Sequence, residues 1–277
     1  MKDLEGRVAV VTGAASGIGL GLARAAARAG MRLVIADLEE AALARAEQEL
    51  SAEGVCVRAQ RTDVSRAEEV EALAELAFAE HAAVHLLCNN AGVIAGRGPV
   101  WKITLDDWRW LVAVNLWGVV HGIRAFLPRM IEQGAPAHVL NTGSIAGLVS
   151  SPGVAAYKAT KHAVVSISET LHHDLRAANA DIGVSVLCPA GVTTHLSEAA
   201  RNRPVELADA TEPDYAAVVQ RRDPSLMMSP DEIAALAFDA VREERFYVLT
   251  HASSQPLLDQ RIEDLRLRRN PSGFSPR

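Results

Sequence analysis

A tyrosine and a lysine one helical turn apart are the residues of this chain best suited to acid–base chemistry. Lys161 follows Tyr157 by four positions, and Ser144 precedes the tyrosine by thirteen residues. If a helix begins at the tyrosine, the phenol and the ammonium lie on the same helix face. The stretch therefore predicts a proton-transfer site, and a solvated helix face is the alternative.

The chemistry requires that the pKa of Tyr157 be lowered. Moving a phenol pKa from about 10 to about 7 takes roughly 4 kcal/mol of preferential stabilisation of the phenolate. A positive charge about 5 Å away provides about 3 kcal/mol at an effective dielectric of about 20. A second cation or a helix N-terminus nearby can add the rest. Lys161 is therefore expected to lower the pKa of Tyr157.

A glycine-rich turn near the N-terminus predicts a phosphate-binding site. An apolar run at 7–12 leads into Thr-Gly-Ala-Ala-Ser-Gly-Ile-Gly at 12–19, and an alanine-rich helical pattern follows. Glycines between a strand and a helix let the backbone approach a diphosphate, whose charge the helix N-terminus stabilises. A merely tight turn is the alternative. The expected dinucleotide contacts are Gly13, Ser16, Gly17, Ile18 and Gly19.

The second apolar run, 31–37, ends on an acidic residue and predicts which dinucleotide binds. Asp37 stands eighteen residues beyond Gly19. A carboxylate at this point accepts hydrogen bonds from both ribose hydroxyls of an adenosine, whereas a 2′-phosphate would meet like charge. Neither Ser16 nor Leu38 offers a cation for such a phosphate. The sequence favours NAD over NADP, and helix capping is a compatible structural role for Asp37.

Strand and helix patterns alternate along the rest of the chain. Further strands are expected at 55–60, 84–88, 137–142, 183–187 and 246–250, with helices at 39–53, 104–133, 157–179 and 229–243. Capping boxes are expected at 65–68 and 229–232. Seven strands alternating with helices predict an α/β fold: a Rossmann-like, doubly wound, parallel seven-stranded sheet with helices on both faces, a three-layer αβα sandwich.

Two segments lie outside this alternation, and one polar residue lies inside a helix. The polar stretch 191–228 is expected to be a substrate lid, and 252–277 a C-terminal tail with a charged helical piece that frays at its end. Asn115 stands among apolar residues of the helix at 104–133. Its amide must find partners, so it is either a satisfied structural asparagine or a functional one.

Composition and charge limit the kinds of partner. The chain has 277 residues, of which 49% are hydrophobic and 22% charged, so a single domain, 1–277, can bury a sizeable core. The formal net charge of −6 argues against nucleic acid and anionic membranes as partners, because both require a basic face. The sequence shows no apolar leader and no run of 18 apolar residues, which predicts a cytoplasmic protein.

Cysteine and histidine spacing predicts neither disulfides nor a metal site. Cys56, Cys88 and Cys188 lack CxxC spacing and border apolar runs, so they are expected to be small buried side chains in a reducing compartment. The adjacent His172 and His173 point about 100° apart on a helix and do not easily share an ion.

From Gly6 to Thr250 the sequence closely resembles the classical short-chain dehydrogenase/reductase family. The resemblance rests on a set of motifs in family order and spacing: Thr12-Gly13-x-x-x-Gly17-Ile18-Gly19, Asp63-Val64, Asn89-Asn90-Ala91-Gly92, Asn115, Ser144 and Tyr157-x-x-x-Lys161. Together they are far more specific than any one alone, and they favour the catalytic interpretation of the tyrosine and lysine over the helix-surface one.

The resemblance implies a role for each catalytic residue. Tyr157 would transfer the proton, and Lys161 would lower its pKa and hold the nicotinamide ribose. Ser144 would orient the reacting oxygen, and Asn115 would hold a water in a local break of its helix.

The resemblance also implies cofactor contacts and self-association. Asp63 and Val64 would lie against the adenine, and Asn90 near the adenosine ribose, with Gly92 in the same motif. Val192 and Thr194 would contact the nicotinamide carboxamide. Family members associate through the helices at 104–133 and 157–179, which implies a homo-oligomer, a dimer or tetramer.

One position departs from the family pattern. Ala190 stands where the family usually has glycine, so a positive φ there would strain the turn by about 1 kcal/mol or more. Either the turn is strained or the loop takes another path. A weaker likeness, in 201–204 and the tail, is to family members that oxidise bulky hydrophobic or aromatic alcohols.

These observations predict an enzyme that transfers a hydride between NAD(H) and a secondary alcohol or ketone. A fairly hydrophobic cyclic or aromatic small molecule is the expected substrate, because Ile94, Leu148, Val149, Val154 and Leu196 should lie near the pocket. The alternatives are an NADP-accepting carbonyl reductase, an epimerase or dehydratase on the same scaffold, and a dinucleotide sensor without turnover.

The four tryptophans near the start of the helix at 104–133 are expected in the core or a subunit interface.

Overall fold

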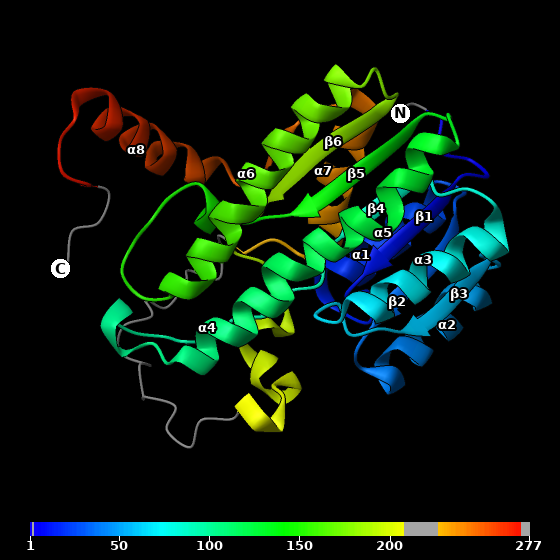
Figure 1. Ribbon diagram of the computed structural model, residues 1–277, viewed down its shortest axis with the longest axis horizontal. Helices are drawn as coiled ribbons and strands as arrows, with labels where there is room; N and C mark the ends of the chain where they lie inside the picture. Colours follow the sequence, from blue (N-terminus) through cyan, green and yellow to red (C-terminus); the bar gives the residue numbers. More distant parts are fainter. Residues whose placement is uncertain (2, 208–226, 273–277) are drawn as a thin grey trace.

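The seven apolar runs form one parallel sheet in the computed structural model, which describes residues 1, 3–207 and 227–272 (Figure 1). The strands are β1 (Val8–Thr12), β2 (Arg32–Asp37), β3 (Val57–Arg61), β4 (Leu86–Asn89), β5 (Ala137–Thr142), β6 (Ile182–Cys188) and β7 (Tyr247–Leu249). Their order is β3-β2-β1-β4-β5-β6-β7, and every neighbouring pair is parallel. The order reverses direction between β1 and β4, which is where open α/β sheets bind ligands.

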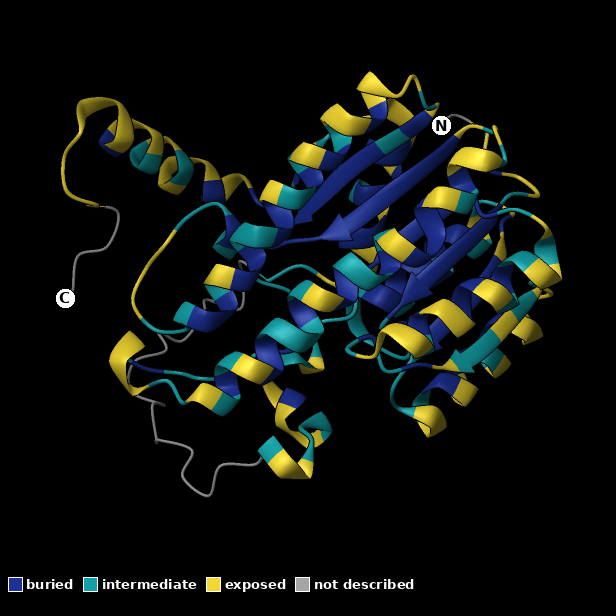
Figure 2. Ribbon diagram, in the orientation of Figure 1, coloured by how far each residue is buried: buried dark blue, intermediate teal, exposed yellow. Residues whose placement is uncertain are grey.

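Helices cover both faces of the sheet, which confirms the predicted three-layer fold. They are α1 (Gly17–Arg28), α2 (Glu40–Ala52), α3 (Ala67–His81), α4 (Leu105–Leu111), α5 (Gly118–Glu132), α6 (Ala155–Ala177), α7 (Pro230–Glu243) and α8 (Gln255–Leu267). Alternate side chains of β1 point to the two layers, since Ala9 and Val11 pack with α1, α2 and α7, whereas Val10 packs with α3, α5 and α6. Figure 2 shows the central strands buried between the exposed outer faces of the helices.

Two predicted capping boxes have different outcomes. The box at 229–232 is confirmed, because the Ser229 side chain and the Glu232 side chain each accept from the other's backbone N–H. The box predicted at 65–68 is wrong. Ser65 instead donates from its backbone N–H and its hydroxyl to Asp63 Oδ1, at 3.0 and 2.7 Å, and α3 begins at Ala67. The nearby carboxylate is a stronger acceptor for the serine donors.

The expectation for the cysteines holds at two of three positions. Cys88 and Cys188 are buried, and burial raises the pKa of both thiols, that of Cys188 to about 12. Cys56 is exposed, so the prediction that it is buried is wrong. It precedes β3, an edge strand of the sheet, where one side faces solvent.

The helical stretch Leu105–Glu132 has the length and mean hydropathy, 1.4, of a membrane span. Its apolar side chains are nevertheless part of the fold, since Phe126 and Met130 are fully buried in the cluster that covers β1 and β4. It is a core helix of the three-layer sandwich.

The first part of the predicted lid is more regular than its sequence suggests. Two 3₁₀-helices, His195–Asn202 and Val205–Leu207, lie in a segment whose sequence has no clear helical or strand periodicity. The remainder of the lid, 208–226, is outside the described residues, as is the end of the tail, 273–277. Helix α8 of the tail extends from the body of the molecule (Figure 1).

Candidate active site

A cavity of about 870 Å³ lies at the carboxyl ends of the strands. Its size is near the top of the range of about 300–1,000 Å³ for ligand sites. The cavity brings together residues predicted from distant parts of the sequence: Gly13, Ser16, Gly17, Ile18, Gly19, Asp37, Asp63, Val64, Asn90, Gly92, Ser144, Tyr157, Lys161, Val192 and Thr194. Asn115 is fully buried and is not among the lining residues.

The glycine loop has the close packing that a dinucleotide cradle requires. Gly13 and Gly17 have φ values of +65° and +54°, which favour glycine. A Cβ on Gly19 would lie 1.9 Å from the carbonyl oxygen of Gly13, so the helix can approach the loop only without a side chain there. Helix α1 then begins at Gly17 and directs its first N–H groups at the cavity. These features fit a bound diphosphate.

Asp37 presents a partly satisfied carboxylate to the same cavity. Its Oδ2 accepts from the N–H of Ala15 at 2.9 Å, and its Oδ1 accepts from the N–H of Glu39 at 3.0 Å. Each oxygen retains a lone pair, so the carboxylate can still accept from ribose hydroxyls. Burial raises the pKa of Asp37, partly offset by these hydrogen bonds.

Asn90 ties three strand ends together. Its Nδ2 donates to the carbonyl oxygen of Thr12 at 3.0 Å, and its Oδ1 accepts from the Thr142 hydroxyl at 3.1 Å. The Thr12 hydroxyl in turn accepts from the backbone N–H of Asn90 at 3.0 Å. The side chain therefore holds the ends of β1, β4 and β5 in register while it lines the cavity.

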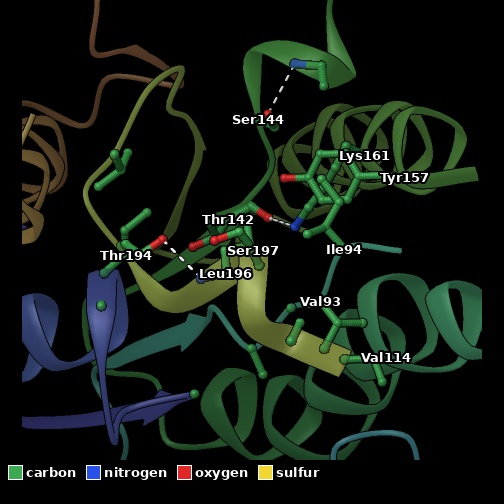
Figure 3. A pocket seen from close by; sticks show the side chains of 18 of the residues that line it. Val93, Ile94, Val114, Thr142, Ser144, Tyr157, Lys161, Thr194, Leu196 and Ser197 are labelled. Atoms are coloured by element: carbon green, nitrogen blue, oxygen red, sulfur yellow. Dashed lines mark hydrogen bonds between the residues drawn. The ribbon is translucent and has the colours of Figure 1, made fainter. Parts of the chain in front are cut away.

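Tyr157 and Lys161 lie side by side on α6, which begins two residues earlier than predicted (Figure 3). The Lys161 ammonium is 5.8 Å from the centre of the tyrosine ring and donates to the carbonyl oxygen of Thr142 at 2.8 Å. Lys161 is only 4% exposed, and burial lowers its pKa to about 8. That pKa leaves the ammonium charged at neutral pH.

Asn115 sits in a π-helical turn, Val112–Trp117, between α4 and α5. Its amide exchanges two hydrogen bonds with the backbone of Val93, at 2.8 and 2.9 Å, and donates to the Thr160 hydroxyl at 3.3 Å. A Cβ on Gly92 would lie 3.3 Å from Asn115 Oδ1 and 3.5 Å from the Lys161 ammonium. The predicted break in the helix is present, and Asn115 is both structurally satisfied and next to the lysine.

Ser144 follows β5, caps the 3₁₀-helix Ile145–Gly147 and lines the cavity. Its hydroxyl accepts from the N–H of Ala146 at 3.1 Å and is 3.4 Å from the carbonyl oxygen of Pro189, to which it donates. Figure 3 shows Ser144 and Tyr157 facing the same space. Both contacts fix the serine rotamer, so its oxygen has a defined position.

The loop after β6 reaches the glycine loop without backbone strain. Ala190 is not among the non-glycine residues with positive φ in the described part of the chain, so the strain considered for that position does not arise. Val192 pairs with Met228 as an isolated β-bridge. A Cβ on Gly17 would lie 3.1 Å from the Thr194 methyl, which places that threonine over the start of α1.

The sequence does not reveal two lining side chains that bond to Glu39, close to Asp37 in the chain. Arg201 lines the cavity and pairs with Glu39 at 2.6 Å, and Asn202 donates to the same carboxylate at 2.7 Å. These contacts lower the pKa of Glu39. A cation from a distant part of the chain therefore lies near the expected ribose, although positions 16 and 38 offer none. The partners are 162 residues apart, so no local pattern could reveal them.

His195 lies at the edge of the cavity, and Leu148 lies outside it. His195 lines the cavity rim but is exposed and pairs with Glu198 at 3.2 Å. Leu148, expected near the pocket, is not among the lining residues and packs beside Val165 instead. Within the described residues, no three His, Cys, Asp or Glu side chains gather as a metal site would require.

Comparison with known proteins agrees with this geometry. A family model described as short chain dehydrogenase matches residues 7–204. The CLA biosynthesis dehydrogenase/reductase of Lactiplantibacillus plantarum is 37% identical over 270 residues, covering 95% of this chain and 94% of the relative. The 1-deoxy-11-beta-hydroxypentalenate dehydrogenase of Streptomyces exfoliatus is 38% identical over 263 residues, covering 95% and 89%. A short chain dehydrogenase/reductase from Burkholderia phymatum, solved in complex with NAD, is 44% identical with a TM-score of 0.94, covering 100% and 99%. The chain therefore belongs to the short-chain dehydrogenase/reductase family.

Proposed function

We propose that this protein is an NAD-dependent oxidoreductase that interconverts a secondary alcohol and a ketone. The observation that carries the proposal is that Ser144, Tyr157 and Lys161 line the same cavity as Asp37 and the glycine loop. A dinucleotide whose diphosphate lies at the start of α1 would extend along the strand ends towards the tyrosine. When bound, the nicotinamide supplies or accepts the hydride at the substrate carbon.

Side chains of the protein would handle the proton and the reacting oxygen. Tyr157 exchanges a proton with that oxygen, and the charged Lys161 beside it stabilises the phenolate. Ser144, whose oxygen is held by the N–H of Ala146, would turn its hydroxyl hydrogen from the Pro189 carbonyl to the reacting oxygen and orient it. Asn115 would hold a water that connects the lysine to solvent, which its position beside Gly92 and Lys161 supports.

The family resemblance suggests roles for other residues that line the cavity. Asp63 and Val64 would lie against the adenine, and Asn90 and Gly92 near the adjoining ribose. Val192 and Thr194 would meet the carboxamide. The support for these roles is that all six residues line one cavity.

The substrate is proposed to be hydrophobic, cyclic or aromatic. Val93, Ile94, Val114 and Leu196 surround the space in front of Tyr157 (Figure 3), and Trp110 also lines it. An apolar wall of this kind favours a ring system over a charged molecule. The Streptomyces relative is named for a hydroxylated compound, which agrees with an alcohol substrate. Residues 191–228 would act as its lid.

The choice of NAD rests on Asp37 and Glu39. Two carboxylates near the expected 2′-position would repel a phosphate. The Burkholderia structure was solved with NAD, which agrees with this choice. Arg201 favours the alternative, NADP, because its guanidinium lines the cavity and could pair with a 2′-phosphate. The Arg201 guanidinium would first have to break its ion pair with Glu39.

A panel of secondary alcohols and ketones, followed at the NADH absorbance, tests the proposal. Aromatic and alicyclic alcohols should reduce NAD⁺ in stoichiometric amounts, with NADP⁺ turned over much more slowly. An epimerase or dehydratase would convert substrate without net NADH, and a sensor would bind NADH without turnover. Tighter binding of NADPH than NADH would remove the role proposed for Asp37.

We also propose that the chain forms a homo-oligomer, a dimer or tetramer. Large apolar side chains are exposed around α4 and the following turn: Trp101 is 80%, Leu105 70% and Trp117 49% exposed. Trp110, in contrast, is buried in the core. Exposed apolar surface of this kind is typical of an interface. Light scattering that gave the mass of one chain at micromolar concentration would overturn the proposal.

A further inference from the structure

One buried histidine outside the family match contacts the loop that faces the cofactor. His251 follows β7, lies beyond the matched residues 7–204 and is 8% exposed. Its Nε2 is 2.8 Å from the carbonyl oxygen of Gly191, and its Nδ1 accepts from the N–H of Ala190 at 3.4 Å. The hydroxyl of Thr250 is 2.7 Å from the same Nδ1.

Only one form of the imidazole satisfies all three contacts. A carbonyl oxygen can only accept, so Nε2 must carry the proton that it donates to Gly191. A backbone N–H can only donate, so Nδ1 must present its lone pair to Ala190. The Thr250 hydroxyl then donates to Nδ1. The three contacts therefore select the tautomer that carries its proton on Nε2, and both ring nitrogens are used.

The contacts of His251 complete the fixation of the loop 189–194. Pro189 is held from the 3₁₀-helix Ile145–Gly147, because its carbonyl oxygen accepts from the N–H of Ile145 at 2.9 Å. Gly191 is held from the other side by the N–H of Met228 at 3.0 Å. Between these two points, His251 bonds to the N–H of Ala190 and to the carbonyl oxygen of Gly191. The N–H of Ala190 therefore has a side-chain partner. Glycine at this position would need the same partner.

We propose that His251 is a positioning residue that sets the loop 189–194 against the nicotinamide half of the cofactor. It acts through the backbone of Ala190 and Gly191, and thereby through Val192 and Thr194, which line the cavity. The inference rests on the proposed function. Loss of the histidine contacts should loosen the nicotinamide end while leaving the adenosine end, which the glycine loop and Asp37 hold, unchanged.

Calorimetric titration with NADH and with ADP-ribose separates the two ends, because ADP-ribose lacks the nicotinamide. His251→Phe keeps the ring volume but removes both polar contacts. It should weaken NADH binding about tenfold, the usual effect of losing one or two hydrogen bonds, and change ADP-ribose binding less than about twofold. His251→Gln, which retains a donor near the Nε2 position, should recover most of the NADH affinity. The exposed His173 provides the matched control, His173→Asn, which should change neither affinity.

Equal weakening of both ligands, or unchanged NADH affinity in both His251 variants, would overturn the inference. Should the phenylalanine variant fail to fold, His251→Ala, which also removes both polar contacts, takes its place with the same expected results. Failure of the proposed function has a different signature, because the wild-type protein itself would then not bind NADH in the titration.

Discussion

The two walls of the cavity are held in different ways. The cofactor wall consists of strand ends and the start of α1, and its polar side chains bond to neighbouring backbone, as Asn90 does with Thr12. The opposite wall, called the substrate wall after its proposed role, includes the loops 148–154 and 189–207. Long side chains tether it from outside: Lys158 to Ser151, Arg203 to Asp107, and Arg201 to Glu39.

This difference indicates which wall can vary. The cofactor wall inherits its geometry from the sheet, so altering it means altering the core. The substrate wall depends on a few side-chain contacts, each of which can change without disturbing the sheet. Local opening should therefore occur on the substrate wall at a lower free energy than global unfolding. His251 is an exception on this wall, because it is itself buried and bonds to the backbone of Ala190 and Gly191.

Removing the tyrosine hydroxyl should have the largest effect and should leave both walls intact. Tyr157→Phe keeps the ring but removes the proton, so kcat should fall about 10²–10⁴-fold with NADH binding nearly unchanged. Tyr247→Phe is the matched control, since that hydroxyl is bonded to Glu169 on the surface. Retention of more than about a hundredth of the wild-type turnover would show that Tyr157 is not the acid–base group.

Breaking the buried ion pair should release the substrate wall alone. The side chains of Arg203 and Asp107 are 8% and 10% exposed, and they lie 2.6 Å apart. Arg203→Met leaves a buried carboxylate unpaired, which costs about 3 kcal/mol. Hydrogen exchange at 195–207 should accelerate roughly 100-fold, the equivalent of that free energy, while exchange in β1 and β5 stays the same.

Arg109→Met is the control for the ion pair, because Arg109 is 64% exposed and pairs with Asp106 on the same helix. An exposed pair contributes less than about 1 kcal/mol, so exchange should hardly change. If Arg203→Met accelerated exchange throughout the sheet as well, the two walls would not be separate units.

Acid should weaken the sheet through His138, a fully buried residue of β5 that contacts Ser185 at 2.8 Å. Burial lowers its pKa to about 3. The unfolded chain binds a proton near pH 6.5 and the folded chain does not, so stability is complete above about 6.5 and is lost as pH falls towards about 3. The loss approaches about 1.4 kcal/mol per pH unit.

Urea unfolding between about pH 7 and about pH 5 measures this contribution. The stability difference between wild type and His138→Asn should shrink as the pH falls, because only the wild type carries the proton penalty. His173→Asn, at an exposed position, should keep the wild-type pH dependence. An identical slope for His138→Asn and wild type would refute the assignment.

The contact that joins the two walls should have the smallest effect. Arg201 and Glu39 are 38% and 30% exposed, so solvent and salt weaken their pairing. Arg201→Met should speed NADH dissociation about two- to fivefold, and the difference should shrink at high salt. Arg28→Met removes an exposed pair with Asp231 away from the cavity and should leave the dissociation rate unchanged. A larger, salt-independent change would mean that the two walls are coupled through the core.

Local patterns predicted the elements well and the contacts of exposed polar residues less well. The capping box at 229–232 formed, with the Ser229 and Glu232 side chains each accepting from the other's backbone N–H. The similar pattern at 65–68 did not form, because Asp63 competes for the serine. Asn115 could be recognised as unusual from its apolar neighbours. Its partner Val93 is 22 residues away and could not be recognised from the local sequence.

The sequence by itself determined the seven-stranded sheet, the glycine cradle and the spacing of Tyr157 and Lys161, because all of these follow from periodicity and from residues close together in the chain. Only the tertiary structure decided that Arg201 lies beside Glu39 and that His251 holds the loop after β6. These pairs are separated by 162 and about 60 residues, and folding alone brings them together. Contacts of this length depend on how helices and loops pack on the sheet, and a local pattern contains no information about that packing.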